Sequence, residues 1–322
     1  MATLYSSIDT GVPSIAIGNG DTYYFGAFKT ILKACLVSGY GSKPAAGWTL
    51  AAEDTNYLIL RNGSGSGYIC FTYTTLGFVR ITLAATFDGV ASNIIAGQGV
   101  KTGTAASNST PQVIYIASLA ANTRFCWAMA ADNKSAVLTL FWYANNSGQA
   151  YENMTSGSWP GLSLVFGEDS SGNFVAVGGR NTTSTGSSSV NNLNAAGMTV
   201  LRDPATGLLV DTGAITPATP LGPTAAQEGA TVYPLERVDL VRFPWMTTAK
   251  DAGNLRGVAV QPNAVGYMNY TLRSVGKGSD VTDITLNNAA NPFELVSGVW
   301  VSPLKTYFNN GGMFLTTDAR FW

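Results

Sequence analysis

The stretch FCWAMAADNKSAVLTLFWY, residues Phe125 to Tyr143, carries the clearest fold signal in this chain. Two apolar runs flank the polar tetrapeptide Ala131–Lys134, which contains Asp132 and Asn133. Asp and Asn favour tight turns because their short side chains bond to nearby backbone N–H groups. The pattern is typical of a β-hairpin, so it predicts two antiparallel strands joined at this tetrapeptide.

Strand-sized runs of the same kind recur along most of the chain, separated by Gly, Asn, Ser or Pro. A second tight turn is predicted at Asp203–Gly207, which has Pro and Gly at turn positions. Many short strands and one good helix favour a mainly β fold, an antiparallel β-sandwich or barrel, and argue against βαβ order. The predicted strands are Tyr57–Leu60, Tyr68–Tyr73, Phe78–Ala84, Val113–Ala117, Phe125–Ala130, Val137–Tyr143, Leu162–Phe166 and Phe174–Val177.

One amphipathic helix is predicted near the N-terminus, over Phe25–Val37. Its apolar residues recur at helical spacing, while Lys29 and Lys33 occupy the other face. Gly39 and Gly41 follow and end the helix. We interpret Met1–Asp21, a mixed polar stretch that contains glycine ahead of the helix, as an arm that becomes ordered on assembly.

The chain divides near residue 195. We predict an N-terminal helix plus β domain over residues 1–195 and a second β region over residues 196–322. The segment Gly178–Gly197 has almost no apolar residue and predicts a surface loop or linker. The second region includes a Pro-rich stretch that is either an extended arm lying across a neighbouring subunit or a plain surface loop. Its candidate interface residues are Pro217, Pro220 and Pro223.

Charged residues make up only 11% of the chain, against about 25% in ordinary domains. The net charge is -1 and there is no histidine, so the chain lacks the basic patch that nucleic acids require. Without histidine, Ser-His-Asp catalysis and His-ligated zinc are also excluded. No uncharged apolar run reaches the roughly 18 to 20 residues of a membrane span. Low charge leaves little repulsion between copies and favours association.

Residues Gly39–Thr49, reading GYGSKPAAGWT, form the most distinctive stretch. Its glycines permit backbone angles closed to other residues, its proline stiffens the middle, and its aromatics offer large contact areas. The stretch predicts either a helix-to-strand crossover whose aromatics cover the core, or a ligand pocket or subunit contact. The candidate interface or structural residues are Tyr40, Gly41, Pro44, Gly47 and Trp48.

At this loop the sequence resembles a recurrent family of structural proteins in tailed bacteriophages. The resemblance weakens after residue 180 and returns at the end of the chain. It implies a component of the virion and supplies no residue-level mechanism. Its motifs are the helix Lys29–Val37 with the GYGSKPAAGWT-type loop, Trp127 with Asp132, Phe141–Tyr143, the Phe-Gly-Asp-like turn Phe166–Asp169, and Phe314–Trp322.

The acidic pairs Glu53–Asp54, Glu168–Asp169 and Asp280 with Asp283 lie beside turn-forming residues, so we expect solvated turns and helix caps rather than catalysis. No EF-hand spacing is present. Three cysteines, Cys35, Cys70 and Cys126, fit no disulfide framework and are expected to be buried thiols. No catalytic, cofactor or metal residue is therefore predicted.

The resemblance implies a component of a tailed phage virion, assembled in the bacterial cytoplasm, and the low charge favours association, so we expect a non-enzymatic structural protein that forms a homo-oligomer on the capsid, neck or tail. Its partners would be other copies and other virion proteins. The alternative is a receptor-binding tail protein that grips a host surface glycan through exposed aromatics. The candidates for that role are Trp142, Tyr143, Trp159, Trp245 and Trp300. A depolymerase-like spike enzyme is a third hypothesis.

Overall fold

The computed structural model describes sixteen stretches of the chain, and all elements and contacts named below lie within them. They are residues 1–13, 21–74, 78–100, 103–104, 107–116, 126–141, 160–178, 199–202, 215–218, 236–242, 253–261, 271–273, 283–285, 293–296, 298–304 and 312–322.

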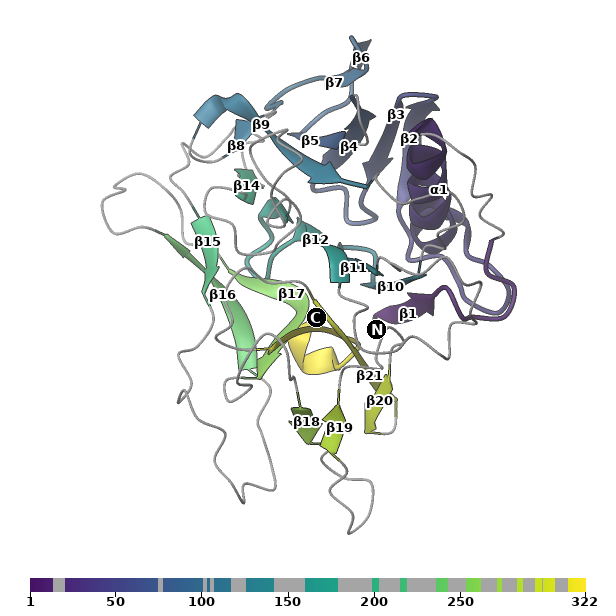
Figure 1. Ribbon diagram of the computed structural model, residues 1–322. Coiled ribbons are helices and arrows are strands. Elements are labelled where there is room, and N and C mark those ends of the chain that lie inside the picture. The colour runs from purple at the N-terminus through teal and green to yellow at the C-terminus, as the bar shows by residue number, and fades with distance from the viewer. Residues whose placement is uncertain are drawn as a thin grey trace.

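The fold is mainly β, as the sequence predicts, and is built from three six-stranded sheets with one helix near the N-terminus (Figure 1). Every described strand pair is antiparallel. The central sheet has the order β1 (Thr3–Ser6), β10 (Cys126–Ala131), β11 (Ser135–Phe141), β12 (Pro160–Glu168), β13 (Phe174–Val177) and β14 (Thr199–Arg202).

The other strands form two larger sheets and two hairpins. The N-terminal sheet has the order β2 (Thr49–Asp54), β3 (Tyr57–Arg61), β4 (Tyr68–Tyr73), β5 (Phe78–Ala84), β9 (Ser107–Tyr115) and β8 (Gly103–Thr104). The C-terminal sheet has the order β15 (Ile215–Ala218), β16 (Glu236–Arg242), β17 (Asn254–Gln261), β22 (Gly312–Thr316), β21 (Val299–Pro303) and β20 (Phe293–Val296). The hairpins are β6 (Gly89–Ala91) with β7 (Ile94–Ala96), and β18 (Thr271–Arg273) with β19 (Asp283–Thr285).

The predicted hairpin around Asp132 is confirmed. Strands β10 and β11 pair from Cys126 opposite Phe141 to Ala131 opposite Ala136. The other predicted strands are confirmed as β3, β4, β5, β9, β12 and β13, with ends that differ by a few residues. Alternating apolar residues and short polar turns therefore suffice to locate this part of the fold.

The predicted helix is confirmed but begins earlier. Helix α1 spans Asp21–Lys33 and continues as the π-helical turn η1 (Ala34–Ser38). Its apolar face is buried in the layer between the N-terminal and central sheets, where Phe28 meets Phe71 edge to face at 5.3 Å between ring centroids. Phe71 in turn meets Phe166 of the central sheet at 5.7 Å. Aromatic contacts thus connect helix and both sheets.

The central sheet is buried on both faces, which explains its nearly continuous apolar strands. In β10, Trp127 and Met129 face the first core cluster, between the N-terminal and central sheets. Ala128 and Ala130 face the second, between the central and C-terminal sheets. Side chains alternate along a strand, so each face contributes every second residue. Figure 1 shows the central strands between the other two sheets.

The interpretation of the N-terminal stretch as an arm ordered on assembly is wrong for Thr3–Ser6. These residues form β1, which pairs with β10 from Thr3 opposite Ala131 to Ser6 opposite Ala128. Tyr5 is fully buried in the first core cluster. The sequence did not predict this strand, because a single aromatic residue in four does not distinguish a strand from a polar arm.

The domain boundary near residue 195 stays a prediction. The second core cluster joins Val165 and Val175 of the central sheet to Val258 and Leu315 of the C-terminal sheet, so packing extends across that point. Of the predicted Pro-rich stretch, Pro217 lies in edge strand β15 opposite Leu240. An edge strand tolerates proline because one side needs no N–H donor.

Several predicted features lie outside the described residues. They are the turn Asp203–Gly207, the loop Gly178–Gly197 apart from Gly178, and both Pro220 and Pro223.

Candidate functional site: the Gly39–Thr49 loop and the polar junction

The loop Gly39–Thr49 first completes the end of the helix. The last carbonyl groups of a helix lack partners within it. Here Ala46 N donates to Cys35 O and Trp48 N to Leu36 O, both at 2.9 Å. The chain then enters β2. This is the arrangement of a helix-to-strand crossover.

The first half of the loop packs against the N-terminal strand. Tyr5 Oη donates to Pro44 O at 2.7 Å, and Lys43 Nζ donates to Leu4 O at 2.9 Å. At Gly41, φ is +53°, and a Cβ there would collide with the carbonyl oxygen of Thr10. Glycine is required at this position because no other residue combines that angle with such a close approach.

The second half places Trp48 in the core, where it is 2% exposed. Its Nε1 donates to Asp132 O at 2.8 Å, and its ring meets Phe166 edge to face at 5.4 Å. Tyr40 is half-buried and meets Trp127 edge to face at 6.4 Å. Both aromatics therefore cover the core, as the crossover interpretation expects.

The remaining candidate loop residues lie at the surface. Gly41, Pro44 and Gly47 are exposed, and a Cβ at Gly47 would lie 3.4 Å from the Asn133 side chain. A contact between subunits at these residues stays a prediction.

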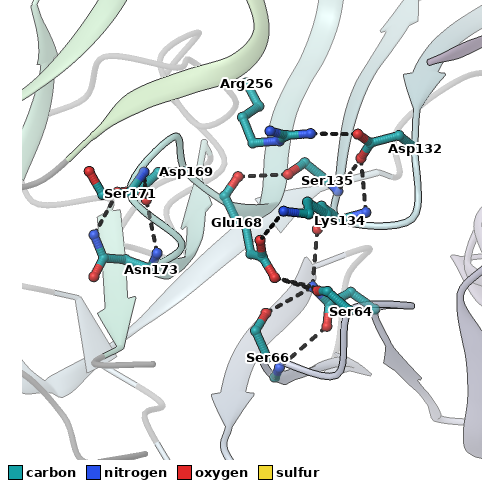
Figure 2. Close-up of polar contacts among 12 residues, drawn as sticks. Ser64, Ser66, Asp132, Lys134, Ser135, Glu168, Asp169, Ser171, Asn173 and Arg256 are labelled. Carbon is teal, nitrogen blue, oxygen red and sulfur yellow. Dashed lines mark hydrogen bonds and ion pairs between the residues drawn. The ribbon is translucent and has the colours of Figure 1, made fainter. Parts of the chain in front are cut away.

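Next to Trp48, which bonds to Asp132 O, three turns meet in a group of polar side chains that we call the polar junction. Figure 2 shows Ser64, Asp132, Lys134, Ser135, Glu168, Asp169, Asn173 and Arg256 of this group. Asn62 also belongs to it, because its Nδ2 donates to Lys134 O at 3.2 Å. Asp132 holds the β10–β11 turn, because its Oδ1 accepts from Lys134 N and Ser135 N at 2.9 Å. Its Oδ2 pairs with the guanidinium of Arg256 on β17. One carboxylate thus fixes a turn and ties it to the C-terminal sheet.

Glu168, only 7% exposed, lies at the end of β12 and connects the β12–β13 hairpin to the β3–β4 and β10–β11 turns. Its Oε1 accepts from the Ser64 hydroxyl in the β3–β4 turn, and its Oε2 lies 3.6 Å from Lys134 Nζ. Its backbone oxygen accepts from Ser135 Oγ at 2.6 Å. A buried carboxylate requires such partners because desolvation strongly penalises its charge.

Asp169 accepts four hydrogen bonds and is 2% exposed. Its Oδ1 accepts from Ser171 N and Asn173 N, closing the β12–β13 turn. Its Oδ2 accepts from Asn173 Nδ2 and from Gly253 N, both at 2.8 Å. Asp169 thus takes the turn role expected for it, and it also contacts the segment leading into β17.

The expectation that this acidic pair is solvated is wrong. Glu168 and Asp169 are buried, because the turn that carries them packs against the β3–β4 turn and the start of β17 rather than facing water. Glu53, by contrast, lies at the surface and pairs with Lys33 at 2.7 Å, and Asp54 is exposed beside it.

The last residues of the chain add a further contact to Arg256. Its guanidinium lies 5.9 Å from the ring of Trp322, whose Nε1 donates to Thr316 O at 2.7 Å. A Cβ at Gly257 would collide with the Trp322 ring, and φ is +70° there. Asp318 caps the short helical turn η4 (Ala319–Phe321) and pairs with Arg320, whose hydrogen bond lowers the pKa of the Asp318 carboxyl.

Tyr5 and Cys35 lie in the first core cluster and the loop residue Tyr40 packs against it, with the two phenol rings 5.9 Å apart between centroids. Burial raises the pKa of Tyr5 and of Tyr40 above the usual range for tyrosine. It also raises the pKa of the Cys35 thiol well above its ordinary value. Cys35 and Cys70 are free and buried, as the sequence predicts. Burial therefore favours the neutral, protonated form of each of these groups.

The polar junction joins turns; each of its carboxylates accepts hydrogen bonds from turn backbone or neighbouring side chains. Within the stretches that the structure describes, no three His, Cys, Asp or Glu side chains gather as a metal site would require. The described helices include none with the length and apolar character to cross a membrane.

Sequence reasoning missed Arg256, the buried state of Glu168 and Asp9, whose Oδ2 accepts from Ser6 N and from Tyr40 Oη, both at 2.7 Å. Arg256 follows Asp132 by more than a hundred residues, so no local spacing could reveal the pair. Asp9 looked like one more acid in a polar stretch. Of the predicted glycan-binding aromatics, Trp300 lies in β21 and is half-buried, and the other four lie outside the described residues.

No family model matches the chain, and a search of curated proteins found no match.

Proposed function

We propose that this protein is a non-enzymatic structural component of a tailed phage virion, which assembles as a homo-oligomer on the capsid, neck or tail. The observation that carries the proposal is where the resembling motifs lie in the fold. Most of them come together around Trp48, although they span more than two hundred residues of sequence.

The contacts among these motifs are direct. Trp48 of the loop bonds to Asp132 and packs on Phe166. Tyr40 packs on Trp127, and Arg256 connects Asp132 to the terminal Trp322. The residues on which the resemblance rests are thus ones that build a scaffold, and their polar groups are used to join turns. Such a packing role fits a protein that works by assembly rather than by catalysis.

Charge supports the same proposal. With 18 basic and 19 acidic residues in 322, copies experience little electrostatic repulsion. When uncharged surfaces come into contact, no charged groups lose their water, so the large desolvation penalty of burying charges does not arise.

The test is to locate the chain in an assembled particle. Particles imaged by cryo-electron microscopy should contain density that fits the three-sheet fold, repeated with the symmetry of capsid, neck or tail. Cross-linking of the same particles should join this chain to itself and to other virion proteins. Particles that lack the chain, or that carry it without contacts to other virion proteins, would overturn the proposal.

Glycan binding through exposed aromatics stays a prediction. Glycan-array binding that disappears on Trp300→Ala, in a variant that keeps its fold, would favour it.

A further inference from the structure

The outer side of strand β1 is an edge of the central sheet. Hydrogen-bonding groups along a strand point alternately to one side and the other. Ser7 N donates to Trp127 O of β10 at 3.0 Å. Because the direction alternates along the strand, the backbone N–H and C=O groups of Ser6 and Leu4 point away from β10. Such an edge is a template for pairing with a strand of another molecule.

The side chains of two loop residues and of Asp9 form hydrogen bonds with these outward-pointing backbone groups. Lys43 Nζ donates to Leu4 O at 2.9 Å. Ser6 N donates to Asp9 Oδ2 at 2.7 Å and approaches Tyr40 Oη at 3.1 Å. Tyr40 Oη donates to the same Asp9 oxygen at 2.7 Å, and Lys43 Nζ lies 3.6 Å from the other. The three side chains therefore hold one another in place over the edge.

We propose that Asp9, Tyr40 and Lys43 form an edge cap, which prevents a strand from a second copy of this chain from pairing with β1. The blocked partner is a second copy because the chain's near-zero net charge does not keep copies apart. Ile8, which is 51% exposed next to β1, would add apolar contact to such pairing.

At the end of edge strand β2 of the N-terminal sheet, a lysine also bonds to a strand carbonyl. Strand β2 is the first strand of that sheet, and Lys29 Nζ donates to Asp54 O at 2.6 Å. In both places a lysine from the helix or loop occupies a carbonyl of an edge strand. Lysine suits this role because a strand that approached would have to desolvate its charge. The inference is independent of the proposed function.

The test compares Lys43→Met with Lys33→Met by sedimentation over a range of protein concentrations. The two lysine side chains are similarly exposed, 30% for Lys43 and 34% for Lys33, and each is paired with a carboxylate, but Lys33 bonds to the Glu53 side chain instead of an outward β1 group. We expect Lys43→Met to associate beyond the wild-type state and Lys33→Met to match the wild type. The variant Asp9→Ala/Tyr40→Phe/Lys43→Met should associate at a concentration lower by about a hundredfold, because three capping contacts no longer have to be broken.

Hydrogen exchange identifies the edge that pairs. Association through β1 should slow exchange of the Leu4 and Ser6 amides relative to the dissociated variant. Circular dichroism checks that each variant is folded, and if the triple variant unfolds, Lys43→Met carries the test alone. Equal sedimentation of Lys43→Met and Lys33→Met would overturn the proposal, and so would association that leaves the Leu4 and Ser6 amides unchanged.

Discussion

The two core clusters that flank the central sheet differ in the kind of residue that fills them. The first, toward the helix and the N-terminal sheet, contains Trp48, Trp127 and a series of phenylalanines. The second, toward the C-terminal sheet, consists mainly of alanine, valine and leucine. Large aromatics bury about 150–250 Å² each, so the first cluster provides more burial per residue. The C-terminal sheet therefore depends more on the polar contacts of Arg256 and Gly253 and on the packing of the last residue, Trp322.

The largest expected effect is in the first cluster. Trp48→Ala removes a buried indole and its bond to Asp132, so it should lower the free energy of unfolding by about 3–5 kcal/mol. Val258→Ala in the second cluster should cost only about 1–3 kcal/mol. Urea unfolding monitored by fluorescence measures both. Equal losses would remove the contrast between the clusters.

Next in size is the contact between the polar junction and the C-terminal sheet. Asp169→Ala leaves the N–H groups of Ser171, Asn173 and Gly253 without their acceptor, so we expect a loss of about 2–4 kcal/mol. Exposed Asp54→Ala is the matched control and should change stability by less than about 1 kcal/mol. A similar loss in the free energy of unfolding in both variants would contradict a role for Asp169 in joining these turns.

A smaller and more local effect is expected at Gly257. Gly257→Ala forces the Trp322 ring to move, because a Cβ there would overlap it. We expect faster proteolysis of the last residues and a loss of about 1–3 kcal/mol, as for other strained backbone positions. Gly172→Ala controls for the positive φ alone, because φ is +81° there and a Cβ would meet nothing within 4 Å. Equal effects would mean that contact with Trp322 does not matter.

The smallest effect at neutral pH concerns the tyrosines under the loop, and it grows with alkali. Because burial raises the folded-state pKa of Tyr5 and Tyr40, the unfolded chain loses those protons first. Their contribution to stability is complete below the unfolded value of about 10 and falls as pH rises above it. The free energy of unfolding should drop above about pH 10, less steeply in Tyr40→Phe. An unchanged slope in that variant would contradict this.

The sequence predicted the regular parts of this fold because their signals are local. The hairpin at Asp132, the strands of the first half and the helix each follow from a pattern within about twenty residues. The relation between the sheets could not be predicted, because it depends on residues such as Asp132 and Arg256 that are distant in sequence. The glycines and aromatics of the loop showed that it was unusual, but not that Lys43 and Tyr40 lie over the edge of β1.

Sedimentation equilibrium of the purified chain tests the central claim most directly, that this sparsely charged protein acts by assembling with copies of itself. A defined oligomer is expected, with a mass that is a whole multiple of 33.7 kDa. A folded chain that stays at the mass of a single copy across the full concentration range would contradict it.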